Sequence, residues 1–269
     1  MKSTLPPGFT FSQSNLRDYL DCPRRFQWRH LERRPWPALR TSEMAAWEEA
    51  MMHGQQFHQL MFQASLGLDV SAQIAAAPPR VRGWWNAWRD HPLTDLPDDR
   101  TLSELTLSVP VGDYALLARF DRLCLGADGR AVIVDWKTDR RVPSPAALAD
   151  HVQTIVYRCV LLEGISHLIG GAPPDPAHLS LVYWFAESPA SPVWIAYSAD
   201  GHRQAAGQIR SWTDEIAGLP ADGFDCTADP KTCLRCEYRA LCDRDQGVAT
   251  DWRVETSDFL FEVPAGMDW

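Results

Sequence analysis

The sequence predicts an α/β fold in which a mixed β-sheet is flanked by helices. Alternating or continuous apolar runs predict consecutive strands at 103–111, 114–125 and 130–138. Residues 126–129, Gly-Ala-Asp-Gly, supply the turn that folds the second of these strands back against the third. Helical patterns precede and follow the three strands. A chain of 269 residues, 45% of them hydrophobic, can bury one large core.

The region before the strands, residues 1–100, is expected to be helical. Three helices are predicted there, at 12–31, 43–66 and 80–90. The segment 67–100 contains the pair Pro78-Pro79 and also Pro97. We therefore expect this segment to be a helical insertion before the sheet.

After the three strands, the chain is expected to return to helix before it completes the sheet. The predicted elements are a helix at 145–163, strands at 179–186 and 191–198, and a helix at 200–218. A loop-rich segment with several cysteines follows. No internal repeat or low-complexity tract interrupts this order, so we predict one elaborated domain over 1–269.

Two acidic residues and a lysine lie on consecutive predicted strands. Successive side chains of a strand point to opposite faces, so Asp135 and Lys137 share a face and lie roughly 6.5 Å apart along the strand. The hairpin brings Asp121 beside Asp135. Two carboxylates on adjacent strands can hold Mg²⁺ or Mn²⁺, which polarises a phosphate and activates water, and a nearby ammonium stabilises the phosphorane. The pattern predicts a metal-dependent nuclease site, with a structural ion pair as the alternative.

The choice of lysine at position 137 favours a chemical role. Only three of the 26 basic residues are lysines: Lys2, Lys137 and Lys231. A compact ammonium has a pKa that can move, which a guanidinium does not offer. Glu104, on the preceding strand, is expected either to approach the metal or to be solvated, because Leu105 and its alternate neighbours take the opposite face.

The charge of the chain is unevenly distributed. The net charge is −9, but residues 212–269 hold 13 acidic and five basic side chains, a net of −8. Residues 17–40 hold seven arginines against three acids. In 80–89, arginines alternate with Trp84, Trp85 and Trp88. Such a pattern can grip phosphates and stack unpaired bases of single-stranded DNA, although we expect two of these tryptophans to pack in the core.

The chain has seven cysteines and no apolar run of membrane-spanning length, which predicts a reduced, cytoplasmic protein that does not enter the membrane. Four of them are candidate metal ligands: Cys22, Cys233, Cys236 and Cys242. One remote and three clustered thiolates are typical of an iron-sulfur cluster, and zinc remains the alternative. Cys226 is a candidate substitute ligand. The two others, Cys124 and Cys159, are expected to be buried inert thiols.

Several motifs together resemble the PD-(D/E)xK nuclease superfamily, in its RecB-like and CRISPR-associated exonuclease branch. The site residues form D-x13-D-x-K and are followed by Gln153-Thr-Ile-Val-Tyr157. Residues 54–58 resemble the G-x-x-x-H motif, residues 14–26 the S-x-L-x-x-Y-x-x-C-P-x-x-F signature, and residues 233–242 the C-x-x-C-x5-C triplet. These motifs occur in the family's order from residue 14 to residue 242.

The resemblance implies roles that the residue types alone leave open. It selects His58 over His53 as a ligand of Mg²⁺ or Mn²⁺, with the Trp136 carbonyl as a further ligand. It implies that Gln153 and Tyr157, which share a helix face, position the lysine or a DNA phosphate. It also implies a 4Fe-4S cluster on the four cysteines named above.

The implied architecture is a restriction-endonuclease-like core with a helical N-terminal region and an iron-sulfur cap. Its parts are expected at 1–100 (helical), 101–219 (catalytic core), 220–246 (cysteine-rich cluster region) and 247–269 (acidic, aromatic tail). The implied function is a DNA exonuclease or end-processing nuclease in repair, recombination or CRISPR adaptation, with a helicase or CRISPR adaptation proteins as partners. The alternatives are a non-cleaving DNA-binding or scaffold module and the nuclease partner of a separate helicase, since no G-x-x-x-x-G-K-[ST] phosphate loop is present.

Overall fold

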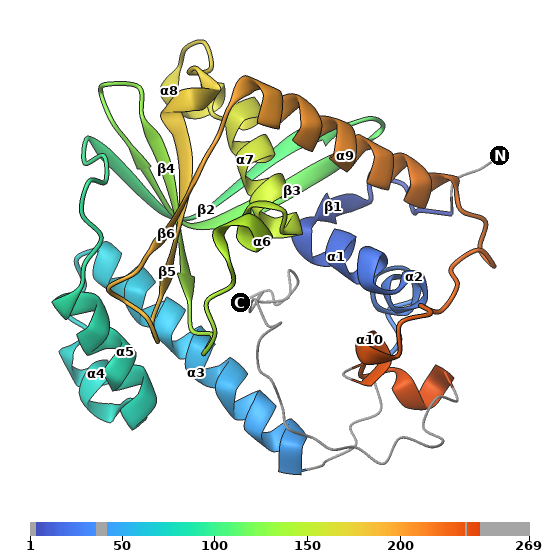
Figure 1. Ribbon diagram of the computed structural model, residues 1–269, viewed down its shortest axis with the longest axis horizontal. Coiled ribbons are helices and arrows are strands. Elements are labelled where there is room, and N and C mark those ends of the chain that lie inside the picture. The colour runs from blue at the N-terminus through green and yellow to red at the C-terminus, as the bar shows by residue number, and fades with distance from the viewer. Residues whose placement is uncertain (1–3, 36–41, 235, 243–269) are drawn as a thin grey trace.

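A six-stranded mixed sheet lies at the centre of the computed structural model, which describes residues 4–35, 42–234 and 236–242 (Figure 1). Helices cover both faces of the sheet, which confirms the predicted α/β class. The strands are β1 (Thr10–Ser12), β2 (Arg100–Val111), β3 (Tyr114–Leu125), β4 (Ala131–Lys137), β5 (Leu179–Phe185) and β6 (Val193–Ala196). The α-helices are α1 (Gln13–Asp21), α2 (Pro23–Phe26), α3 (Ser42–Ser65), α4 (Ser71–Ala76), α5 (Pro79–Asp90), α6 (Pro145–Ala149), α7 (Val152–Gly164), α8 (Ser166–Ile169), α9 (Ala199–Gly218) and α10 (Pro230–Leu234).

The long strand β3 organises the sheet. Strand β2 pairs with it antiparallel along its whole length, so β1 and β4 share the other edge of β3. Strand β1 pairs in parallel with residues 115–117, and β4 pairs antiparallel with residues 122–125. Residues 118–121 therefore lie between the two partners, where the sheet parts. Strand β5 pairs in parallel with β4, and β6 pairs antiparallel with β5.

The central strands are apolar because both of their faces are covered. All seven residues of β4 are buried. On one face, α7 packs over Ile133, Leu181 and their neighbours, and α9 packs against α7. On the other, α3 and α5 pack over Val134 and Trp184. The polar residues in the middle of this layered core must therefore find partners inside the protein.

The predicted helix at 12–31 is wrong as a single element. Ser12 ends β1 and caps α1, since its hydroxyl accepts the Asn15 amide at 3.3 Å and its own amide donates to the Asn15 side chain at 2.9 Å. The helix breaks at Cys22, whose backbone is extended, and Pro23 begins the next helix. A residue before proline disfavours the helical conformation, which explains the break. A π-helical turn at Gln27–Leu31 follows.

The predicted helix at 145–163 is likewise two helices. Helix α6 ends at Ala149, and α7 begins at Val152 with the His151 side chain accepting the Gln153 amide at 3.3 Å. The predicted insertion at 67–100 contains α4 and α5, as expected. The acidic tail at 247–269 lies outside the described residues.

Candidate functional site

The predicted site residues surround the open stretch of β3. Asp121 is the last residue before the pairing of β3 with β4 begins at Arg122 and Val134. Its Oδ2 accepts the backbone amide of Trp136 at 2.9 Å, so the carboxylate spans the point where the strands part. Its Oδ1 lies 3.4 Å from Nδ1 of His58 on α3. The structure thus brings Asp121 and His58 together, as the sequence predicts.

Glu104 completes a group of three side chains that could hold a metal ion. It lies on β2 opposite Asp121, in a stretch where the paired register passes from Ser103 directly to Leu105. Its φ is 52°, a left-handed conformation that is uncommon for a residue with a side chain and is retained mostly at functional sites. Ligand atoms of His58, Glu104 and Asp121 all lie within 4.8 Å of one another.

His58, Glu104 and Asp121 shift one another's pKa values. Burial opposes ionisation of Asp121, but His58, the Trp136 amide and the charge of Lys137 together hold the pKa of Asp121 below its usual value. Burial also disfavours the His58 imidazolium, yet Asp121 raises the pKa of His58. Burial and the charge of Asp121 raise the pKa of Glu104, although Arg119 lies 3.3 Å away. A divalent cation would relieve this crowding of carboxylates.

A second buried group lies at the end of β4. Lys137 Nζ is 2.8 Å from Asp135 Oδ2 and donates to Gln153 Oε1 at 2.8 Å. The Gln153 Nε2 donates to Asp135 Oδ1, also at 2.8 Å. Asp135, Lys137 and Gln153 are each about 2% exposed. Asp135 Oδ2 contacts the Lys137 ammonium at 2.8 Å and no other hydrogen-bond donor among the described residues.

Both charges of this pair are perturbed. Burial raises the pKa of Asp135 to about 6 despite the attraction of Lys137. For Lys137, burial favours the neutral amine, but Asp135 outweighs it and raises the pKa above its usual value. The ring of Tyr183 lies 5.4 Å below the ammonium and adds a cation-π contact. The lysine is therefore held as a cation.

Tyr157 is buried beside this group. Its hydroxyl accepts a hydrogen bond from Gln13 of α1 at 3.1 Å, and its ring packs edge-on against Phe120 at 5.1 Å. Gln153 therefore contacts the lysine directly, whereas Tyr157 links α7 to α1.

Asp139 is a buried site residue that the sequence interpretation missed. It continues the alternating row of Asp135 and Lys137, and that period is the signal that could have revealed it. Neither of its side-chain oxygens has a hydrogen bond. Burial raises the pKa of Asp139 to about 7. Unpaired buried carboxylates are costly, so this residue is a second candidate for a cation partner.

The G-x-x-x-H glycine has a steric role. A Cβ at Gly54 would lie 3.2 Å from Thr138 Oγ1, just beyond the end of β4. A residue with a Cβ at this position would require the Thr138 side chain to shift by a few tenths of an ångström. Because His58 follows one helical turn later, this approach helps set the position of the imidazole.

The predicted cysteine ligands converge on one small cavity. Its lining contains the four predicted cysteines together with Cys226: Cys22, Cys226, Cys233, Cys236 and Cys242. The Sγ atoms of Cys226 and Cys242 are 3.7 Å apart. The α1–α2 break carries Cys22 to this point, where its sulfur accepts the Thr227 amide at 3.4 Å. The five thiols suit a thiophilic metal or cluster.

The basic segment at 17–40 is partly neutralised within the protein. Asp18, which is 5% exposed, lies 3.0 Å from Arg25, 2.8 Å from Arg29 and 2.7 Å from His30. Arg29 also pairs with Glu237. These arginines hold the N-terminal helices to the cysteine region, so they are less available to DNA than the sequence suggests.

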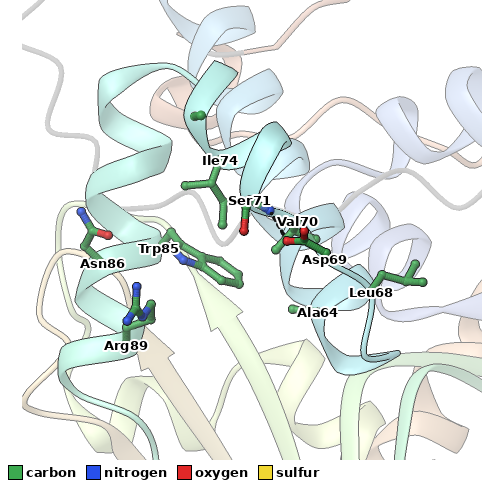
Figure 2. A pocket seen from close by; sticks show the side chains of 10 residues that line it. Ala64, Leu68, Asp69, Val70, Ser71, Ile74, Trp85, Asn86 and Arg89 are labelled. Carbon is green, nitrogen blue, oxygen red and sulfur yellow. Dashed lines mark hydrogen bonds between the residues drawn. The ribbon is translucent and has the colours of Figure 1, made fainter.

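Of the three tryptophans of α5, Trp84 is buried, whereas Trp85 and Trp88 are both partly buried against the same apolar cluster. Trp84 packs on Phe57 at 5.9 Å, and Trp88 packs on Trp136 at 4.6 Å. Trp85 instead lines an open cavity of about 470 Å³ between α3, α4 and α5 (Figure 2). Its other walls are apolar, and polar side chains lie at the rim: Asp69, Ser71, Asn86 and Arg89.

No helix among the described residues is long and apolar enough to cross a membrane.

The chain matches a known family model over most of its length. The model of the PD-(D/E)XK nuclease superfamily matches residues 10–243. Among solved structures, the crystal structure of a "Putative exonuclease" from Eubacterium rectale is 10% identical, with a TM-score of 0.52 and 90% of each chain covered. The crystal structure of SSO0001 is 14% identical, with a TM-score of 0.41, and covers 88% of this chain and 87% of its own. No curated protein sequence matches the chain.

Proposed function

The chain belongs to the PD-(D/E)XK nuclease superfamily, and we propose that it is a metal-dependent DNA exonuclease or end-processing nuclease that acts on single-stranded DNA. The main observation behind this proposal is that the ligand atoms of His58, Glu104 and Asp121 lie within 4.8 Å of one another. They adjoin the buried Asp135–Lys137 pair, whose carboxylate affects the pKa of both His58 and Glu104.

These residues fit a hard divalent cation. The donor set is carboxylate oxygen and imidazole nitrogen, and Asp135 Oδ2 contacts only the Lys137 ammonium among the described residues. His58, Asp121 and Asp135 would hold Mg²⁺ or Mn²⁺, with Glu104 as a further ligand and the Trp136 carbonyl as another. When bound, the ion supplies Lewis-acid polarisation of the phosphate and a water of lowered pKa.

Lys137 acts as a fixed cation. Asp135 and Gln153 hold its ammonium at 2.8 Å each, and its raised pKa keeps it protonated at neutral pH. In this state it stabilises negative charge that develops on a phosphate, or donates a hydrogen bond to a water, and it does not accept a proton. Gln153 is a positioning residue, because it orients both members of the ion pair.

The cavity beside Trp85 supports a preference for unpaired bases. The indole is half-buried, with Arg89 and Asn86 at the rim. A flat aromatic side chain beside a cation suits base stacking with a phosphate contact. Ala64 of the cavity wall is six residues from His58 on α3, which is about 9 Å along the helix axis and about 240° around it. The cavity and the metal ligands therefore lie on different faces of α3.

We further propose that Cys22, Cys233, Cys236 and Cys242 hold a 4Fe-4S cluster, with Cys226 as a substitute ligand. Their convergence on one cavity supports this assignment. The cluster would tie the N-terminal helices to the chain after α9. All seven cysteines are free thiols, which suits a reducing cytoplasm. Any ATP-driven unwinding would come from a separate helicase, and CRISPR adaptation proteins are the other candidate partners.

Cleavage of end-labelled single-stranded DNA with Mn²⁺ tests the proposed activity. We expect products from the wild type, and none from Lys137→Ala or Asp135→Ala. Lys231→Ala is the matched control, because that lysine lies in the first turn of α10 and is exposed. Equal degradation by all four proteins would refute the assigned roles, and intact DNA with the wild type would favour a non-cleaving DNA-binding module.

The cluster is tested by anaerobic purification. We expect a brown protein that contains iron and sulfide, and a loss of both in Cys233→Ser. Cys124→Ser, a buried thiol on β3, should keep them. A colourless protein that contains zinc would overturn the cluster assignment.

A further inference from the structure

A second group of metal-binding side chains lies between α7 and α9. Cys159 and Glu163 are four residues apart on α7 and so share a helix face. His202 lies in the first turns of α9, which packs against α7 (Figure 1). Cys159 follows Tyr157 by two residues, about 200° around the helix. This group therefore faces away from the nuclease site.

The three ligand atoms already lie close together. Cys159 Sγ is 3.5 Å from Glu163 Oε1, and His202 Nε2 is 3.8 Å from the same oxygen. All three atoms lie within 4.8 Å of one another. We propose that Cys159, Glu163 and His202 form a zinc-binding site that joins α7 to α9.

The distances fit tetrahedral zinc. Bond lengths of about 2.3 Å to sulfur and about 2.1 Å to nitrogen or oxygen give edges of about 3.6 Å for sulfur to oxygen and about 3.4 Å for nitrogen to oxygen. The observed separations of 3.5 and 3.8 Å differ from these edges by a few tenths of an ångström. The third separation, from Cys159 Sγ to His202 Nε2, lies within 4.8 Å, so these two ligand atoms must come to about 3.6 Å when the ion binds.

The surroundings of His202 suit a ligand. Its Nδ1 lies 2.9 Å from the Tyr197 hydroxyl, and the two rings meet edge-on at 5.8 Å. If Nδ1–H donates to the hydroxyl oxygen, the Nε2 lone pair faces Glu163. A metal-bound histidine almost always donates its other N–H to such a partner, which fixes the tautomer and the ring.

The site is accessible and selects among cations. Cys159 is buried, whereas the Glu163 side chain is 36% exposed, so an ion can enter beside the carboxylate and keep a water as its fourth ligand. One thiolate and one imidazole favour zinc over magnesium. Binding converts the Cys159 S–H to a zinc-bound thiolate and releases its proton. Burial and Glu163 raise the pKa of this thiol, so zinc binds more tightly as pH rises.

The experiment compares zinc stoichiometry among variants of the full-length protein. Each protein is purified anaerobically and kept in excess Mg²⁺, so that the carboxylate site is occupied. Zinc is then titrated against a chromophoric chelator. The five-thiol cavity contributes equally to all samples, so differences between variants report the α7–α9 site alone.

We expect Cys159→Ala and His202→Gln each to bind one zinc equivalent fewer than the wild type. Tyr197→Phe should bind as many zinc equivalents as the wild type, but with a 10- to 100-fold weaker affinity at this site. Cys124→Ala is the matched control, since this buried thiol on β3 contacts Thr101 and lies outside the group. The same stoichiometry in all five proteins would overturn the proposal. His202→Gln changes a half-buried side chain, so the test survives if Cys159→Ala fails to fold.

Discussion

Replacement of Gln153 by leucine probes the buried group at the end of β4. The change removes both hydrogen bonds that link this amide to Asp135 and Lys137 while it nearly conserves volume. A hydrogen bond to a charged partner stabilises by about 1.5–3 kcal/mol. Loss of two costs on the order of 3–6 kcal/mol, and burial of the leucine offsets roughly 1.5 kcal/mol. We expect a net loss of about 1.5–4.5 kcal/mol in the free energy of unfolding.

Urea unfolding measures this change. The transition midpoint should fall while the slope stays constant, because the folded state loses contacts and not compactness. Nuclease activity should fall further than stability explains, because Lys137 loses one of its two anchors. Gln208→Leu, on the exposed surface of α9, is the matched control and should change neither. A Gln153→Leu protein as stable as this control would refute the energetic role of the amide.

Three further changes test separate parts of the site. Gly54→Ala should lower activity, because its Cβ would press on Thr138 Oγ1, and Thr138→Ala in the same protein should restore activity. Asp139→Asn should raise the free energy of unfolding above pH 7 by an amount on the order of 4 kcal/mol, because the variant has no buried carboxylate to ionise. Unfolding in the presence of a metal chelator measures this change. Glu104→Gln should raise the Mn²⁺ concentration for half-maximal cleavage at least ~10-fold, since the site loses a charged oxygen ligand.

The direction in which Asp139 changes stability with pH follows from its raised pKa. The folded protein keeps a proton on this carboxyl between pH 4 and about 7, whereas the unfolded chain releases it near pH 4. Its contribution to stability is therefore lost as pH rises through that window, and Asp139→Asn should flatten the decline. A steeper decline in the variant would contradict this account.

Each of these changes has a matched control. Gly83→Ala, on α5, meets no atom within 4 Å of its new Cβ and should leave activity unchanged. Asp113→Asn, in the exposed turn before β3, should not alter the pH dependence. Glu48→Gln, exposed on α3, should leave the Mn²⁺ requirement as it is. A control that matched its test variant in effect would argue against the assigned contact.

Local patterns were enough to predict the strands that carry the site. The alternation in β4 places Asp135 and Lys137 on one face, and the glycine turn folds β4 back against β3 so that Asp121 approaches them. The grouping of the predicted cysteines was also foreseeable, because three of them are close in sequence. For the strands and for the three clustered cysteines the information lies within a short stretch of chain, whereas the place of Cys22 beside them rests on the family resemblance.

Other features depend on contacts between distant segments. The left-handed backbone of Glu104 arises where β2 passes Asp121, so the sequence left its orientation open. The parallel pairing of β1 with β3 joins residues about one hundred positions apart in the chain. Cys159 was expected to be an inert thiol because it lies on an apolar helix face, and its proximity to His202 depends on the packing of α9 against α7. Neither local periodicity nor residue type predicts contacts between such distant segments.

Direct titration of Mn²⁺ into the protein tests the central claim, a divalent cation held between α3, β2 and β3. Isothermal titration calorimetry of the wild type should show saturable binding that is lost in Asp121→Asn and kept in Asp113→Asn. Asp121 joins His58 to the Trp136 amide, so circular dichroism should accompany the titration to establish that the variant is folded. Unchanged Mn²⁺ binding by folded Asp121→Asn protein would contradict the account.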